Sequence, residues 1–88
     1  MAHMLAKLTG VEVAAVKEKL AADAPGHAEQ GMHLEHLWTN EAAPNEVLFL
    51  FRLDDVDHCK RLMERVHSIA RLEDPSAKLP ETIFLDAH

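Results

Sequence analysis

The sequence predicts an α+β domain whose elements follow in the order strand, helix, strand, strand, helix, strand. Its 88 residues are enough for one compact domain and too few for two ordinary ones. Two segments repeat apolar residues with the period of a helix, and residues 46–52 form an apolar strand between them. Right-handed crossovers then place both helices on one face of a four-stranded antiparallel sheet.

The first strand is expected at residues 4–8, where alternate apolar side chains share one face. His3 and Met4 form the dipeptide that a common cloning junction leaves, so residues 1–3 are expected to be vector residues. The domain is therefore expected to span residues 4–88.

The first helix is expected to start with a capping box, because Thr9 and Glu12 have the required spacing. Val13, Val16 and Leu20 continue at helical spacing. The Pro-Gly pair at residues 25–26 is expected to end the helix at about residue 24.

A hairpin is expected next, from strands at residues 32–39 and 46–52 joined by a turn at 40–45. Strict alternation places four residues of the first strand on one face: Met32, Leu34, His36 and Trp38. The second strand is apolar on both faces, with Val47, Phe49 and Phe51 on one and Leu48 and Leu50 on the other.

The second helix is expected to begin after Asp54, a suitable N-cap residue. Its apolar stripe comprises Val56, Cys59, Leu62, Met63, Val66, Ile69 and Ala70. Residues 75–80 are expected to form a loop between two prolines, and residues 82–85 the last strand.

The predicted sheet leaves one apolar face bare, and soluble monomers avoid exposing such a patch. A second copy of the chain is the simplest cover. The order of its elements and its strand with two apolar faces make the chain resemble the dimeric α+β barrel proteins of ferredoxin-like fold. These include antibiotic-biosynthesis-monooxygenase-like and stress-responsive domains. The resemblance implies a homodimer, with any ligand between sheet and helices or between paired sheets. It carries no catalytic residue to this chain.

Composition excludes several partners. A formal charge of −6 opposes binding to phosphate backbones and anionic lipid, so neither nucleic acid nor a membrane is expected as partner. The single cysteine, Cys59, cannot form an internal disulfide, which favours the reducing cytoplasm. No cofactor-binding fingerprint occurs, and no cofactor is expected.

His36 and Trp38 are the first-choice site, because both are expected on the apolar face and carry polar atoms that need partners when buried. His36 suits the role of a general base toward a planar organic substrate. The alternative is a hydrogen-bonded core histidine beside a core tryptophan.

Further ligand-binding candidates are His33, Glu35, Phe49, Phe51 and Arg52. Arg52 suits a ligand carboxylate, or equally Glu35 or an aspartate of the second helix. His33 and His36 are three residues apart on a strand and are expected on opposite faces, so they cannot bind one metal ion together. His33 and Glu35 share a face and could, but a polar strip on the strand is the favoured interpretation, and no metal site is predicted. A register slip of one residue would exchange His33 and His36 between faces.

Three functions follow. The first is a homodimer that binds a small apolar or aromatic molecule near His36 and Trp38. The second is a cofactor-independent monooxygenase or isomerase with His36 or His33 as base. The third is a structural or protein-interaction module.

Overall fold

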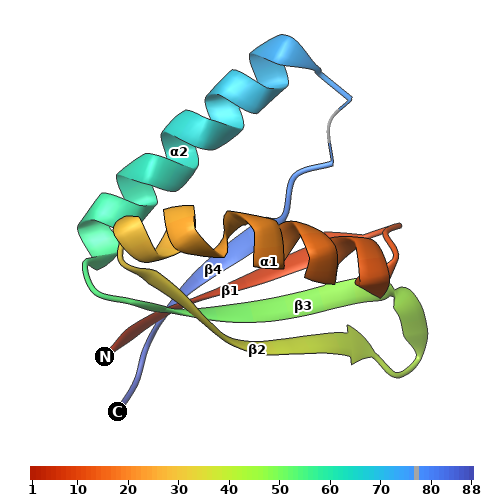
Figure 1. The fold of residues 1–88 in the computed structure, drawn as a ribbon, viewed down its shortest axis with the longest axis horizontal. Coiled ribbons are helices and arrows are strands. Elements are labelled where there is room, and N and C mark those ends of the chain that lie inside the picture. The colour runs from red at the N-terminus through yellow and green to blue at the C-terminus, as the bar shows by residue number, and fades with distance from the viewer. Residues whose placement is uncertain (77) are drawn as a thin grey trace.

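The computed structural model describes residues 1–76 and 78–88 and has the predicted order of elements (Figure 1). The elements are β1 (Ala2–Thr9), α1 (Val13–Glu29), β2 (Met32–Asn40), β3 (Ala43–Leu53), α2 (Val56–Glu73) and β4 (Glu81–Asp86). The four strands form one antiparallel sheet in the order β2-β3-β1-β4. The predicted loop at 75–80 includes residue 77, which lies outside the described residues.

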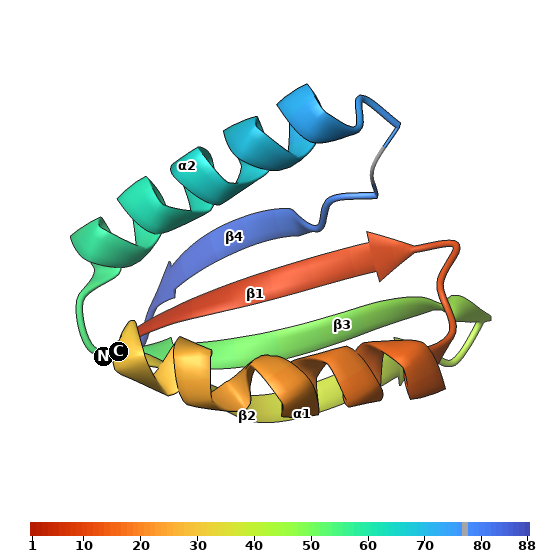
Figure 2. The same cartoon turned by 45° about the horizontal axis from the view of Figure 1, so that its top comes forward.

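Both helices lie on the same side of the sheet, and the other side has no cover within the described chain. Figure 2 shows α1 lying over β3 and β2, while α2 runs along the side of β4 and β1. This arrangement confirms the predicted α+β, ferredoxin-like architecture.

The core lies between α1 and the sheet. Alternate residues of β3 point into it, and Phe49 and Phe51 meet there edge to face, 5.8 Å apart. The buried apolar residues are Met4, Ala6, Val16, Leu20, Met32, Val47, Phe49, Phe51, Leu53 and Cys59. The predicted shared face of Val47, Phe49 and Phe51 is confirmed, and all three are buried.

Helix α1 differs from the prediction at both ends. Its N-cap is Glu12 and no side chain caps it, so the predicted capping box is wrong, because Thr9 still belongs to β1. The helix also continues through Pro25, which sacrifices a single backbone donor. It ends at Glu29, and its C-cap Gln30 is followed by Gly31, whose φ of +73° is the left-handed conformation that follows many helices.

Three further boundaries differ. β1 begins at Ala2, so residues 2 and 3 belong to the sheet, pairing with β3 and β4. The hairpin turn is shorter than predicted, because Asn40 already pairs with Ala43. The N-cap of α2 is Asp55, which accepts a hydrogen bond from the His58 backbone N–H at 3.1 Å, and not Asp54.

Helix α2 is attached mainly at its N-terminal end. Cys59 is its one buried residue, whereas Val66 and Ile69, which the stripe predicts to be buried, are 45% and 50% exposed. In Figure 1 the helix rises away from α1 toward its C-terminal end. The apolar stripe of α2 is therefore only half covered.

Candidate functional site

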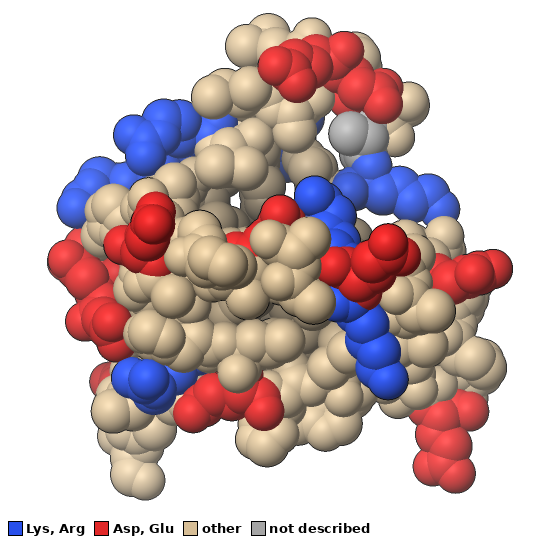
Figure 3. Space-filling model, viewed as in Figure 1, with Lys and Arg blue, Asp and Glu red and all other residues tan. Residues whose placement is uncertain are grey.

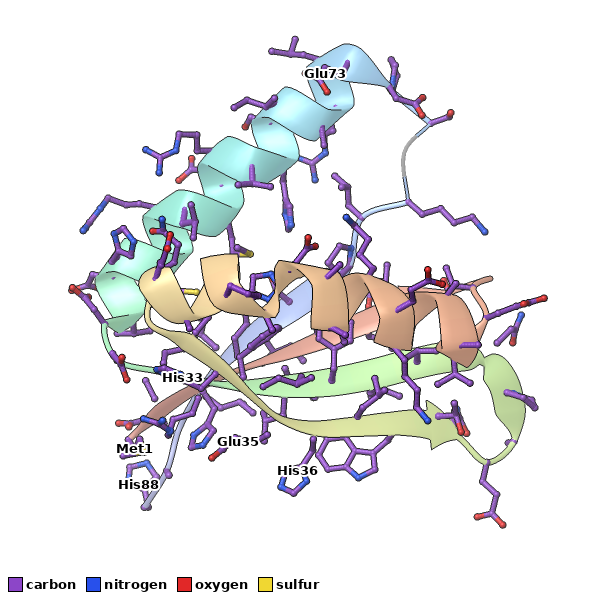
Figure 4. All side chains as sticks on the ribbon, in the orientation of Figure 1. Met1, His33, Glu35, His36, Glu73 and His88 are labelled. Carbon is purple, nitrogen blue, oxygen red and sulfur yellow. The ribbon has the colours of Figure 1, made fainter. Side chains whose placement is uncertain are left out.

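A β-bulge in β2 decides where the predicted site residues lie. Leu34 pairs with Phe51 and His36 with Leu50, so Glu35 is an extra residue in the strand. Beyond it the side chains change faces, and His36 and Trp38 lie on the open face instead of the face of Met32 and Leu34. Figure 4 shows His36 and Glu35 pointing away from the helices.

His36 and Trp38 stack on each other, with ring centroids 4.9 Å apart and planes inclined by 16°. Trp38 is 46% exposed, so neither ring is enclosed in a core. The predicted placement of this pair on the buried face is wrong, because strict alternation ignores the bulge.

The bulge also brings His33 to the same face as His36, although the two were expected on opposite faces. The His33 ring lies 3.0 Å from an Asp54 carboxylate oxygen, and Arg52 lies 3.3 Å from the other oxygen of that carboxylate. The His33 hydrogen bond, aided by the nearby Arg52, lowers the pKa of Asp54. Glu35 lies 3.8 Å from Arg52 and 3.0 Å from His3.

These side chains form a charged corner at one end of the open face, and its members satisfy one another. A guanidinium between two carboxylates needs no ligand to balance its charge. No cluster of three or more metal-ligating side chains occurs within residues 1–76 and 78–88.

The centre of the open face is apolar. Leu50 pairs with Leu5, which pairs with Ile83, so three strands align apolar side chains there. The patch comprises Leu5, Leu48, Leu50, Ile83 and Leu85, with Trp38 beside it. At the far end Lys7 lies within 3.8 Å of both Glu46 and Glu81.

A cleft of about 450 Å³ lies on the opposite side of the sheet, between α1 and α2. Its floor is β1 and β3, and most of its walls are apolar. The residues that line it include Met4, Ala6, Leu8, Val16, Phe49, Phe51, Met63 and Val66. Figure 3 shows a hollow below α2, with Lys or Arg and Asp or Glu atoms at its edge.

Two histidines face this cleft from the two helices, and sequence analysis missed both. His27 of α1 meets Phe51 edge to face at 5.1 Å, and His67 comes from α2. Burial lowers the pKa of each imidazole, so both tend to be uncharged at neutral pH. No hydrogen bond to either ring is found among the described residues.

The spacing of these two histidines along their helices is the signal that could have identified them. His27 follows Leu20 by seven residues, on the same side of α1, but the expected end at the Pro-Gly pair removed it from the helix. His67 follows Met63 by four residues and lies on the apolar stripe.

A smaller cavity of about 260 Å³ lies on the other side of α1, toward β2. It shares four lining residues with the cleft, which are Leu20, His27, Met32 and Phe51, and it also reaches His33 and Leu34. His27 therefore borders both spaces.

The predicted site residues thus separate into two groups. Phe49 and Phe51 line the cleft, and His33 borders the smaller cavity. His36, Trp38, Glu35 and Arg52 line neither space and lie on or beside the open face. Neither of these two spaces brings them together.

Comparison with known proteins establishes the fold. No protein-family model matches the chain, and the search of curated proteins gave no match. A candidate antibiotic biosynthesis monooxygenase from Deinococcus radiodurans superposes with a TM-score of 0.63 at 14% identity, covering 100% of this chain and 93% of that one. An uncharacterized NIPSNAP domain protein from Burkholderia xenovorans gives a TM-score of 0.59 at 21% identity, covering 100% of this chain and 95% of that one.

A protein from Agrobacterium tumefaciens gives a TM-score of 0.58 at 12% identity, covering 100% of this chain and 94% of that one. The predicted resemblance to this fold is confirmed by all three. At such low identities the likeness establishes the architecture and transfers no activity.

Proposed function

We propose that this domain binds a small apolar molecule in the cleft between α1, α2 and the sheet, and that it pairs with a second copy through the open face. The cleft carries the first part of the proposal. Its volume of about 450 Å³ falls within the usual range of ligand pockets, and its walls are mainly apolar.

The half-covered stripe of α2 supports the same conclusion. Val66 and Met63 line the cleft, and Val66 remains 45% exposed. An apolar ligand there would cover both helices and the floor at once, removing apolar surface from water at roughly 25 cal/mol per Å². Apolar atoms bound in the cleft would therefore stabilise the fold.

The open face supports the homodimer. Its apolar centre lies between charged groups of both signs at either end, which is the arrangement of a protein interface with a polar rim. Two-fold pairing would bring identical apolar centres together and bury Trp38. The proposal places the protein in the cytoplasm, where Cys59 stays reduced; neither helix of the described chain has the length and apolar character of a membrane span.

A matched pair of alanines tests the cleft. Both Ala15 and its neighbour Ala14 in α1 are exposed, but only Ala15 lines the cleft. We expect the neutral fluorophore N-phenyl-1-naphthylamine to bind the unaltered protein and the Ala14→Phe variant, and to lose about tenfold or more in affinity for Ala15→Phe, because the added ring occupies the cleft. Equal binding to both variants would remove the cleft from the proposal.

The single tryptophan tests the dimer separately. Trp38 lies on the open face and not in the cleft, so its fluorescence reports on pairing. We expect its emission to shift to longer wavelength on dilution as the dimer dissociates, in parallel with subunit number in native mass spectrometry. A monomer with constant emission at all concentrations would contradict the pairing.

The name of the Deinococcus radiodurans neighbour favours a second function, a cofactor-independent monooxygenase. The sequence pointed to His36 or His33 as base, but the imidazoles that face the cleft are His27 and His67. An uncharged imidazole is the form that accepts a proton. Oxygen uptake with 1-naphthol as probe, abolished by His27→Ala and retained by His36→Ala, would favour the enzyme over the binding domain.

A further inference from the structure

The charged groups of the cleft differ from those of the whole chain. The protein carries a formal charge of −6, yet the charged residues that line the cleft are two lysines, Lys19 and Lys78, and a single aspartate, Asp23. The cleft therefore has a net positive lining inside an acidic protein. Such a lining attracts anions and disfavours cations.

Lys78 is held in place at the cleft. Its ammonium donates a hydrogen bond to the backbone carbonyl oxygen of Gly10 at 2.8 Å, which fixes the side chain and leaves two N–H donors. Among the described residues, the lysines that form ion pairs are Lys7 and Lys19. Lys78 thus has a charge and two donors available for a ligand.

Lys19, on α1, also lines the cleft. It pairs with Asp23 at 3.2 Å, but its side chain is exposed, and an exposed ion pair within a helix is weak enough to rearrange. The two lysines come from segments far apart in the sequence, α1 and the segment before β4.

The imidazoles of His27 and His67 add two further polar groups that face the same space. Each can donate one N–H when neutral, and each gains a second when protonated. An anion in the cleft would favour the protonated form, so its binding and the uptake of a proton would support each other.

We infer that the ligand of the cleft is an apolar carboxylate, whose carboxylate group is held by Lys19 and Lys78 while its hydrocarbon part lies over the floor of β1 and β3. This inference rests on the proposed function and specifies its ligand class. An apolar body matches the apolar lining, and one negative charge matches the net charge of the charged lining residues.

Displacement of N-phenyl-1-naphthylamine by decanoate and by decan-1-ol tests the inference. The two probes share a hydrocarbon chain and differ in the head group, so their difference isolates the charge. We expect decanoate to displace the fluorophore at about tenfold lower concentration than decanol, the size expected for a partly desolvated ion pair. Added salt should weaken decanoate and leave decanol unchanged.

The matched variants are Lys19→Met and Lys17→Met. Lys17 is exposed on the same helix and does not line the cleft, so its loss changes the net charge equally without touching the site. We expect Lys19→Met to reduce the preference for decanoate severalfold, with Lys17→Met behaving as the unaltered protein. Lys78→Met should act in the same direction as Lys19→Met.

The outcomes separate the two proposals. Equal displacement by decanol and decanoate, or equal behaviour of the two α1 variants, overturns the anionic ligand and leaves apolar binding intact. Failure of both probes to displace a fluorophore bound in the cleft overturns this inference alone. Failure of the fluorophore to bind overturns the proposed function together with this inference.

Discussion

The two faces of the sheet are built from the same strands and similar residues, yet they differ in burial. On the face toward the helices, Phe51 of β3 is only 2% exposed. On the other face, its neighbour Leu50 remains partly exposed, and Ile83 of β4 is 55% exposed. Only the first face has a cover within the described chain. The apolar residues on one side of β3 therefore form the core, and those on the other side support the proposed pairing with a second copy.

Substitution of adjacent residues of β3 gives the largest expected contrast. Phe51→Ala should lower the free energy of unfolding by about 3–5 kcal/mol, because it leaves a cavity in the core. Leu50→Ala should lower it by less than about 1.5 kcal/mol at concentrations where the chain is monomeric, since part of that side chain is already in water. Urea denaturation measures both. Equal losses would mean that the open face is buried within the monomer.

A charged substitution on the open face tests the proposed pairing with a second copy. Leu50→Asp should weaken self-association by at least about tenfold, because each paired sheet would bury an unpaired carboxylate. Leu72→Asp is the control: it adds the same charge at a residue of α2 that is 85% exposed and away from the open face. Analytical ultracentrifugation measures the dissociation constants. Equal dissociation of both variants would assign the effect to net charge and contradict the proposed interface.

Much of the fold was predictable because its signals are local. The two-faced pattern of residues 46–52 specified β3, and the stripe from Val56 to Ala70 specified α2. The errors lie where tertiary contacts override local chemistry. Thr9 has the side chain of a helix cap but pairs with Glu46 in the sheet. Pro25 lies inside α1 although a proline removes a backbone N–H and crowds the preceding turn.

The site was less predictable, for two physical reasons. A bulge adds one residue and reverses the facing of everything after it, and nothing in the pattern around Glu35 marks that position. The cleft, in turn, depends on how far α2 stands from α1, which is a tertiary distance. The sequence consequently proposed His36 and Trp38, which share a face with Leu50, and missed His27, which faces the cleft.

The stability that the face toward the helices contributes should depend on pH through His27. Burial lowers the pKa of this histidine below its ordinary value of 6.5. The unfolded chain therefore binds more protons, and stability should fall as pH drops below 6.5, levelling off below the folded pKa. His27→Phe, which keeps a ring beside Phe51, should flatten this decline. His88→Phe, in the exposed tail, is the control; an unchanged slope in His27→Phe would contradict the assignment.

The stability that the open face contributes should change at lower pH and by a smaller amount, through Asp54. Its pKa lies below the ordinary 3.8 because of the hydrogen bond from His33, so the native state holds this carboxylate charged more strongly than the unfolded state does. That contribution is complete above 3.8 and disappears as pH falls through the folded pKa. Asp54→Asn should remove a small part of the loss of stability below pH 3.8 and leave the loss that begins below pH 6.5 unchanged. His27→Phe should reduce the loss that begins below pH 6.5 and leave the one below pH 3.8 unchanged. Free energies of unfolding measured below pH 6.5 and below pH 3.8 thus assign one pH range to each face. A change caused by Asp54→Asn in the upper range would show that the two faces are coupled through the sheet.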